Sequence, residues 1–439
     1  MTGALRFCMF STFYPPYSYG GDGITLQRLC RALVRAGHEV TVVHDADSYT
    51  SLGYPAPTAA ARTDGVEVVT LRSSLRVLSV LLTHQFGRPV VHRAEIAALL
   101  AERQFDVVHF HNVSLVGGPG LFELARGSAT VYTAHEHWLV CPTHVLWRHR
   151  REPCTGRECV RCSLRYGRPP QLWRTTGLLE RSLPHVDTFI ALSEFSRDKH
   201  REFGFPRDME VLPPIVFDED EGALGAPSVS PHPRPYFFYA GRLERIKGLD
   251  DVVPLFRQSD APADLLIAGV GSHERELRAL AGDSPHVRFL GHLSPERLAP
   301  LYRHAVAHIA PSVCFETFGN TLVEAFRQST PVVARRIGPF PEIVGHAGGG
   351  ELFDNAVDLR RSLERFASDR AYRDLLGAAD AAHTRRLGRR TRSCRGIWRS
   401  SSGRSRAVSR QQRPPQRSRS RSTPCARFSR ITPSTSRAP

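Results

Sequence analysis

The feature that most constrains the fold is an alternation of short, uninterrupted apolar runs with segments of helical periodicity. A representative helical segment is 23–36, in which apolar residues recur at helical spacing. Strands that are apolar throughout, rather than at every second position, are typical of a parallel sheet covered on both faces. The strands expected in the first half of the chain are 5–10, 39–44, 66–71, 106–111, 129–133, 188–192 and 210–212.

The pattern stops at Pro213-Pro214 and restarts about twenty residues later. Residues 215–234 are acidic and rich in Pro, Gly and Ser, which is typical of a linker. The second series of expected strands is 236–240, 264–268, 287–290, 307–310 and 331–334. We therefore predict an α/β protein with two doubly wound domains, 1–214 and 235–383. In such sheets, ligands bind beyond the carboxyl ends of the strands, so a cleft between the domains is the expected site.

The strongly basic balance of the chain comes from its last 56 residues. Segment 384–439 holds 17 of the 59 basic residues and none of the 43 acidic ones, so the formal charge of +16 describes a tail and not the body. So much like charge with so little apolar surface predicts a disordered Arg/Ser-rich tail. We favour translation from a shifted reading frame over a basic arm that binds RNA or anionic lipid, and nucleic acid is not an expected partner.

The nine cysteines are expected to be thiols or metal ligands. No apolar run approaches the roughly 20 residues that span a bilayer, and the N-terminus leads directly into a strand, so we expect a cytoplasmic protein. Disulfides are rare in that compartment. Four cysteines lie in an insertion, 141–170, with the spacing C-x₁₂-C-x₄-C-x₂-C, which suggests a structural zinc site; two disulfides are the alternative in an oxidising compartment. They are Cys141, Cys154, Cys159 and Cys162.

Three loops carry the residues that could bind a ligand. The first follows strand 5–10 and ends in Gly20-Gly21, where we expect positive φ and close backbone approach at the start of a helix. The second follows strand 236–240 and holds Gly241, Arg242 and Lys247, whose side chains suit a diphosphate.

The third loop is the most specific, because two glutamates are separated by seven residues around a helix start. Glu316 precedes a helix expected to begin near Phe318, and Glu324 lies about two turns into that helix. A carboxylate accepts hydrogen bonds from two hydroxyl groups at once, which suits sugar hydroxyls and a ribose diol. The helix start also presents backbone N–H groups of Gly319, Asn320 and Thr321.

In this order, these segments resemble the family 4 retaining glycosyltransferases of GT-B architecture. The likeness covers about residues 5–383 and includes the Gly20-Gly21 loop, 133–136, 241–248, 269–271, the Glu-x₇-Glu segment and 331–334. It implies two Rossmann-like domains facing across a cleft, a nucleotide-sugar donor, and a glycan or lipid-linked acceptor. A lipid-linked acceptor implies peripheral contact with the inner face of a membrane.

The resemblance also implies roles for individual residues. Arg242 and Lys247 would hold the donor diphosphate, Glu324 the ribose and Glu316 the transferred sugar, with no cofactor required for catalysis. Gly20, Gly21, Gly241 and the helix start at Phe318, Gly319, Asn320 and Thr321 would complete the donor site. His135 corresponds to the histidine of the family's cleft. We prefer it to His111, since it follows a strand that points to the cleft.

Two departures from the family pattern bear on activity. Members of the family end in a helix that crosses back onto the first domain, and here the Arg/Ser tail replaces that region after about His383. An inactive protein that still binds sugar nucleotides is therefore the alternative hypothesis. Ser329 stands where the family often has glycine.

Overall fold

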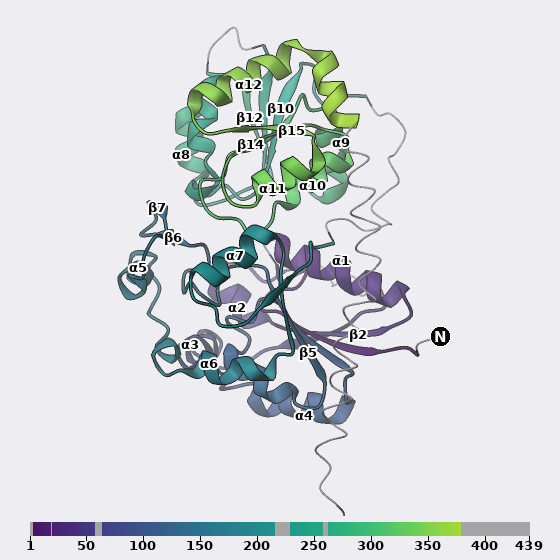
Figure 1. Cartoon of the computed structure of the whole chain (residues 1–439), viewed down its shortest axis with the longest axis vertical. Coiled ribbons are helices and arrows are strands. Elements are labelled where there is room, and N and C mark those ends of the chain that lie inside the picture. Colours follow the sequence, from purple (N-terminus) through teal and green to yellow (C-terminus); the bar gives the residue numbers. More distant parts are fainter. Residues whose placement is uncertain (1–2, 19, 58–63, 216–228, 258–261, 379–439) are drawn as a thin grey trace, which may run out of the picture.

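The computed structural model describes residues 3–18, 20–57, 64–215, 229–257 and 262–378. The predicted tail, 384–439, and most of the predicted linker, 215–234, lie outside these residues. Figure 1 shows two lobes stacked along the long axis of the molecule, each built around one sheet.

The first lobe contains a seven-stranded parallel sheet in the order β3-β2-β1-β4-β5-β8-β9 among the described residues. Its strands are β1 Arg6–Phe10, β2 Glu39–Asp45, β3 Glu67–Leu71, β4 Val107–Phe110, β5 Ala129–Ala134, β8 Thr188–Ala191 and β9 Met209–Val211. Its helices are α1 Gly21–Arg35, α2 Ala46–Ser51, α3 Val77–Phe86, α4 Arg93–Arg103, α5 Cys159–Arg165, α6 Leu178–Ser182 and α7 Glu194–Glu202.

The second lobe contains a six-stranded parallel sheet in the order β12-β11-β10-β13-β14-β15, again among the described residues. Its strands are β10 Tyr236–Ala240, β11 Asp264–Ala268, β12 Val287–Gly291, β13 His308–Ala310, β14 Val332–Arg335 and β15 Gly350–Phe353. Its helices are α8 Glu274–Ala281, α9 Pro295–Arg303, α10 Asn320–Arg327, α11 Phe340–Ala347 and α12 Ala356–Ser368.

Both sheets are apolar on two faces, as the sequence predicts. Separate hydrophobic clusters cover each face: Phe10 and Phe110 belong to one cluster of the first sheet, and Phe7 and Val42 to the other. In each sheet the strand order runs outward in both directions from its first strand, β1 or β10. This doubly wound order places the loops after β1, β4, β5, β10 and β13 at the edge where the two lobes meet.

The predicted strands are all found, and each end lies within one residue of its expected position. The sequence did not predict β15, nor the small antiparallel pair of β6 Trp147–Arg148 and β7 Glu152–Pro153 in the cysteine insertion. In Figure 1 this pair and α5 project from the side of the molecule near the level where the lobes meet.

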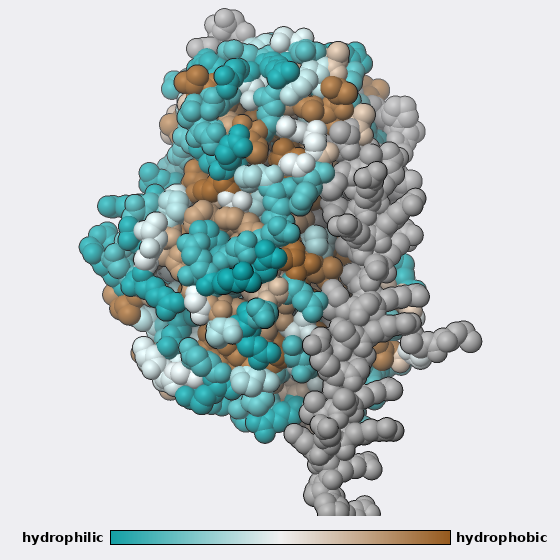
Figure 2. All heavy atoms as spheres, in the orientation of Figure 1, coloured by the Kyte–Doolittle hydropathy of each residue, from teal (hydrophilic) through white to brown (hydrophobic). Residues whose placement is uncertain are grey.

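No helix of the described part is both long enough and apolar enough to cross a membrane. On the face drawn in Figure 2, hydrophobic residues form small patches among hydrophilic ones.

Buried histidines should make the folded protein sensitive to mild acid. Burial lowers the pKa of His200 to about 4, and that of His109 and His308 to about 3. An unfolded chain protonates its histidines near pH 6.5, so the unfolded state binds more protons below that pH. The stability is therefore fully present above about pH 6.5 and is lost as the pH falls toward these lowered values. Each such histidine costs up to about 1.4 kcal/mol per pH unit in this window.

Urea unfolding at pH 7, 6 and 5 measures this slope. His200→Asn removes one buried titrating group, so the variant should lose less stability between pH 7 and 5 than the wild type loses. Equal unfolding midpoints of the wild type at pH 7 and 5 would contradict the expectation.

Candidate active site

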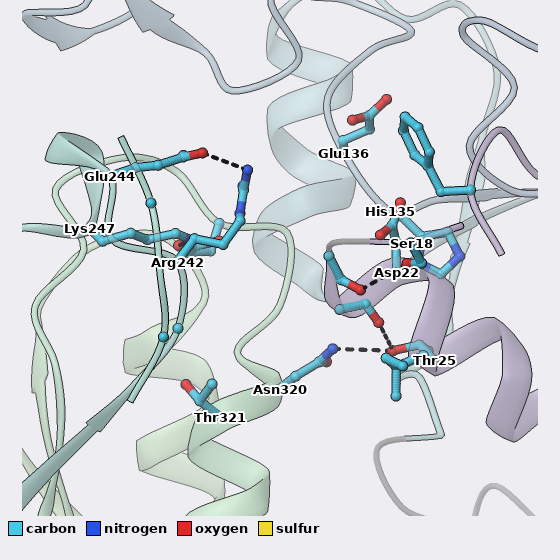
Figure 3. A pocket seen from close by; sticks show the side chains of 18 of the residues that line it. Ser18, Asp22, Thr25, His135, Glu136, Arg242, Glu244, Lys247, Asn320 and Thr321 are labelled. Carbon is cyan, nitrogen blue, oxygen red and sulfur yellow. Dashed lines mark hydrogen bonds and ion pairs between the residues drawn. The ribbon is translucent and has the colours of Figure 1, made fainter. Parts of the chain in front are cut away.

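A cleft of about 2690 Å³ lies between the lobes, and all twelve residues predicted to bind or act on the donor line it. They are Gly20, Gly21, His135, Gly241, Arg242, Lys247, Glu316, Phe318, Gly319, Asn320, Thr321 and Glu324. Figure 3 shows Arg242 and Lys247 on one side of this cleft, and Asp22, Thr25 and His135 on the other. The structure thus gathers loops from both halves of the chain into one site.

The loop after β10 brings Lys247 next to Glu316. The Lys247 Nζ lies 2.6 Å from Glu316 Oε1, and the Ser312 hydroxyl donates to the same oxygen at 2.9 Å. Burial raises the pKa of Glu316, but the Lys247 ammonium and the Ser312 hydrogen bond outweigh it and hold the pKa below its ordinary value. For Lys247, burial opposes the charge and Glu316 favours it, with the net result that its pKa is raised. The pair is therefore ionised at neutral pH.

Arg242 is more exposed than this pair. Its Nη1 lies 2.7 Å from Glu244 Oε1, and 41% of its side chain is exposed. The backbone at Gly241 has φ +156, and Gly269 has φ +136 in the loop after β11. A Cβ at Gly269 would lie 1.9 Å from the Gly241 carbonyl oxygen, so glycine is required for these two loops to meet.

Glu324, which belongs to the second lobe, also contacts the first lobe. Its carboxylate lies 3.5 Å from Arg28 Nη1 of α1, and it accepts a hydrogen bond from the Tyr302 hydroxyl at 3.2 Å. The expected position of Glu324 two turns into a helix from Phe318 is wrong, because α10 begins at Asn320 and Glu324 is just over one turn into it. Gly319 precedes the helix with φ −149 and ψ 68, a non-helical conformation that delays the start.

The Gly20-Gly21 loop meets the start of α10 directly. A Cβ at Gly21 would lie 3.2 Å from the Asn320 amide nitrogen, and that amide donates to the Thr25 hydroxyl at 3.2 Å (Figure 3). The predicted close approach is therefore present at Gly21. The predicted positive φ is wrong for both glycines. Gly20 has φ −121 and caps α1 in an extended conformation, and Gly21 is the first residue of α1 and has no positive φ. Thr317 adds a further link between the lobes by donating to the His135 carbonyl at 2.8 Å.

His135 and His111 are partners, not alternatives. His111 Nδ1 lies 2.8 Å from His135 Nε2, and His111 is buried beneath His135, which lines the cleft. Burial lowers the pKa of His135, although the Asp22 and Glu136 carboxylates act in the opposite direction. A neutral His135 is therefore held in a fixed orientation by a second ring.

Sequence reasoning missed several residues of the cleft. Asp22 accepts a hydrogen bond from the Asn112 side-chain amide at 3.3 Å. The other missed residues each contact a predicted one: Ser312 contacts Glu316, Thr25 contacts Asn320, and Arg28 contacts Glu324. Asp22, Thr25 and Arg28 share the inward face of α1, and that face was the only sequence signal available for them. Their contacts to Asn320 and Glu324 depend on the packing of two lobes, which no local pattern reveals.

The four cysteines of the insertion lie near one another but do not form a ligand set. Cys141 and Cys162 are buried, and the His149 N–H donates to Cys162 Sγ at 3.4 Å. Burial raises the pKa of Cys154 and Cys159. Across the described residues, no three of these sulfurs lie within 4.8 Å of one another, whereas tetrahedral Zn²⁺ with 2.3 Å bonds needs sulfurs about 3.8 Å apart. The sulfurs would have to approach for zinc to bind, and zinc remains a prediction.

Two family descriptions match adjoining parts of the chain. "Glycosyltransferase Family 4" matches residues 19–220, and "Glycosyl transferases group 1" matches residues 223–381. Together they span most of the sequence and both sides of the cleft.

Individual relatives agree with these matches. A glycogen synthase of Mycobacterium tuberculosis H37Rv is 26% identical over 370 residues, covering 77% of this chain and 80% of the relative. A phosphatidyl-myo-inositol mannosyltransferase of Mycolicibacterium smegmatis is 28% identical over 349 residues, covering 77% and 78%.

Solved structures show the same fold. Sucrose-phosphate synthase from Thermosynechococcus elongatus superposes with a TM-score of 0.64 at 18% identity, covering 93% of this chain and 98% of that one. Anabaena HepE in complex with UDP and glucose gives 0.62 at 18% identity, covering 90% and 100%. With both halves matched and the two lobes facing across one cleft, the chain belongs to the family 4 glycosyltransferases of group 1 and has the GT-B fold.

Proposed function

We propose that this glycosyltransferase moves a sugar, with retention of configuration, from a nucleoside-diphosphate sugar to a glycan, lipid-linked or small-molecule acceptor. The observation that carries the proposal is the convergence of Lys247, Arg242, Glu316 and Glu324 on one interlobe cleft. Two cations suit a diphosphate, and two carboxylates suit the hydroxyl groups of a sugar and a ribose.

The chemistry follows from where charge develops. As the glycosidic bond to the diphosphate breaks, negative charge accumulates on the leaving phosphate and positive charge on the sugar ring. We assign stabilisation of the phosphate to Lys247, Arg242 and the N–H groups at the start of α10. This assignment requires no catalytic metal ion.

We assign Glu316 to the hydroxyl groups of the transferred sugar. Its Oε1 is already bonded to Lys247 and Ser312, which fixes the carboxylate for that task. We propose that the acceptor attacks from the face that the diphosphate leaves, where a phosphate oxygen takes the acceptor proton. The neutral His135 ring would lie beside the sugar and the acceptor.

The insertion supplies basic side chains to the wall of the cleft, and we assign this wall to the acceptor. Arg150 and Arg168 line the cleft with Tyr166, and the Arg150 guanidinium lies 5.0 Å from the centre of the Tyr166 ring. We propose that these arginines face the phosphate of a phosphorylated or lipid-linked acceptor, which would bring the protein to the inner surface of a membrane.

The direct test is donor binding followed by product analysis. Thermal shifts with UDP-, GDP- and ADP-sugars should identify one preferred base. Incubation with that donor and an extract of acceptors should release the nucleoside diphosphate. Proton NMR of the first product should show the anomeric configuration of the donor. An inverted anomer would contradict retention, and the absence of any thermal shift would contradict the donor class.

The predicted zinc site has its own measurement. Protein purified under reducing conditions without chelator should contain about one zinc per chain by mass spectrometry. Cys159→Ser should lose that zinc, whereas Cys314→Ser, a buried cysteine outside the insertion, should retain it. Wild-type protein with no bound zinc would leave the four cysteines as reduced thiols.

A further inference from the structure

A second cluster of ligand-type side chains lies behind the cleft wall. Asp45 ends β2, Asp47 lies in α2, and His92 immediately precedes α4. One ligand atom from each residue lies within 4.8 Å of the other two. Their exposed fractions are 2%, 8% and 6%, and none of the three lines the cleft.

The negative charge of this cluster is not balanced by a Lys or Arg among the described residues. Asp45 accepts hydrogen bonds from the Asp47 N–H at 2.9 Å and the Ser48 hydroxyl at 2.6 Å, and Asp47 accepts from the Ser73 N–H at 2.6 Å. These donors are neutral. Two buried carboxylates without a cation are costly, so the site calls for positive charge.

His92 adds a buried imidazole to the two carboxylates. Its Nδ1 lies 3.0 Å from Glu95 Oε2, and its Nε2 is buried without a hydrogen-bond partner in the described structure. A carboxylate on Nδ1 holds the ring proton there and leaves the lone pair on Nε2. This is the arrangement by which a carboxylate orients a metal-binding histidine.

We propose that Asp45, Asp47 and His92 bind one divalent transition-metal ion. Two carboxylate oxygens and one imidazole nitrogen suit Mn²⁺ or Zn²⁺. Such an ion would tie together the end of β2, α2 and the start of α4. Because Ser48 and Ser51 of α2 line the cleft, it would also fix the acceptor-side wall. The site is structural and separate from the donor chemistry.

Manganese is the probe of choice, because the thiolates of the insertion favour zinc. Protein without nucleotide is stripped with chelator, returned to chelator-free buffer and titrated with Mn²⁺ while EPR counts the free ion. We expect one Mn²⁺ to bind per chain and to raise the melting temperature. Pulsed EPR of the wild-type complex should show coupling to one imidazole nitrogen.

Substitutions test whether Mn²⁺ binds at these three residues. Asp47→Asn and His92→Gln should each weaken Mn²⁺ binding at least tenfold. His286→Gln is the matched control, since His286 is also buried and bonded to a carboxylate, that of Asp264 in the other sheet; it should leave Mn²⁺ affinity unchanged.

Two results would overturn the proposal. Wild-type protein that binds no Mn²⁺ would show that these three side chains hold no metal ion. Bound Mn²⁺ without nitrogen coupling would place the ion elsewhere, even if both variants failed to fold.

Discussion

Replacing Lys247 by alanine should lower the turnover number of sugar transfer about 100-fold to 1000-fold, with a smaller change in the donor KM. The Lys247 ammonium is partly buried beside Glu316. A charge there that stabilises the leaving phosphate, as we propose, acts more strongly than it would in water. Its contribution grows as the glycosidic bond breaks, so the loss should appear in kcat rather than in binding. Steady-state kinetics with the selected donor measures both constants.

The chain provides a closely matched control, because its only other lysine is Lys199. The Lys199 and Lys247 side chains are 19% and 18% exposed, and their nitrogens lie 2.7 Å and 2.6 Å from Glu202 and Glu316. Lys199 does not itself line the cleft, although its Nζ lies 4.7 Å from the centre of the ring of Phe315, which does. Lys199→Ala removes a similar ion pair and should retain near wild-type turnover. Lys247→Arg keeps the charge and should recover part of the rate. Wild-type turnover in Lys247→Ala would remove Lys247 from the catalytic assignment.

Replacing Glu324 by alanine should weaken binding of the nucleoside diphosphate about 10-fold to 100-fold. A hydrogen bond to a charged group contributes about 1.5–3 kcal/mol, and every 1.4 kcal/mol is a factor of ten. The dissociation constant is measured by calorimetry with the nucleoside diphosphate and with its 2′,3′-dideoxy analogue. The wild type should discriminate between the two ligands, and Glu324→Ala should bind them almost equally.

Arg28→Ala separates ribose binding from the structural link between the lobes. It removes the 3.5 Å contact to Glu324 but keeps the carboxylate. If Glu324 binds the ribose, this variant should still discriminate against the dideoxy analogue. Equal loss of affinity in Arg28→Ala and Glu324→Ala, with discrimination intact in both, would show that Glu324 acts only as a link.

The strands could be predicted from the sequence because a buried parallel strand must be apolar throughout. Segment 236–240 meets this requirement throughout, and segment 264–268 meets it after its first residue, Asp264; the predicted ends of both coincide with β10 and β11. β15 was missed because Gly350–Phe353 is short, follows a run of glycines and contains Glu351. The pair β6–β7 was missed because each strand has two residues, which is too short for any periodicity.

Which residues line the cleft was predictable, but the contacts between them were not. The position after a strand's carboxyl end placed Arg242 and Glu316 at the cleft. The bonds between Lys247 and Glu316 and between Arg28 and Glu324 join residues 69 and 296 positions apart, so they depend on tertiary packing. From the sequence, His135 and His111 were alternatives for the histidine of the cleft. His135 follows β5 and His111 follows β4, and the parallel pairing of these two strands brings the two rings together.

If Glu324 binds the ribose as proposed, its contact with Arg28 gives one carboxylate two tasks that compete for the same oxygens. In the protein without ligand it holds α1 of one lobe against α10 of the other. A ribose that claims this carboxylate would loosen that hold, and departure of the spent nucleotide would restore it. Glu324 would then exchange Arg28 for the ribose when the donor binds, and the reverse when the product leaves. This one exchange would couple the opening and closing of the two lobes to donor binding and product release.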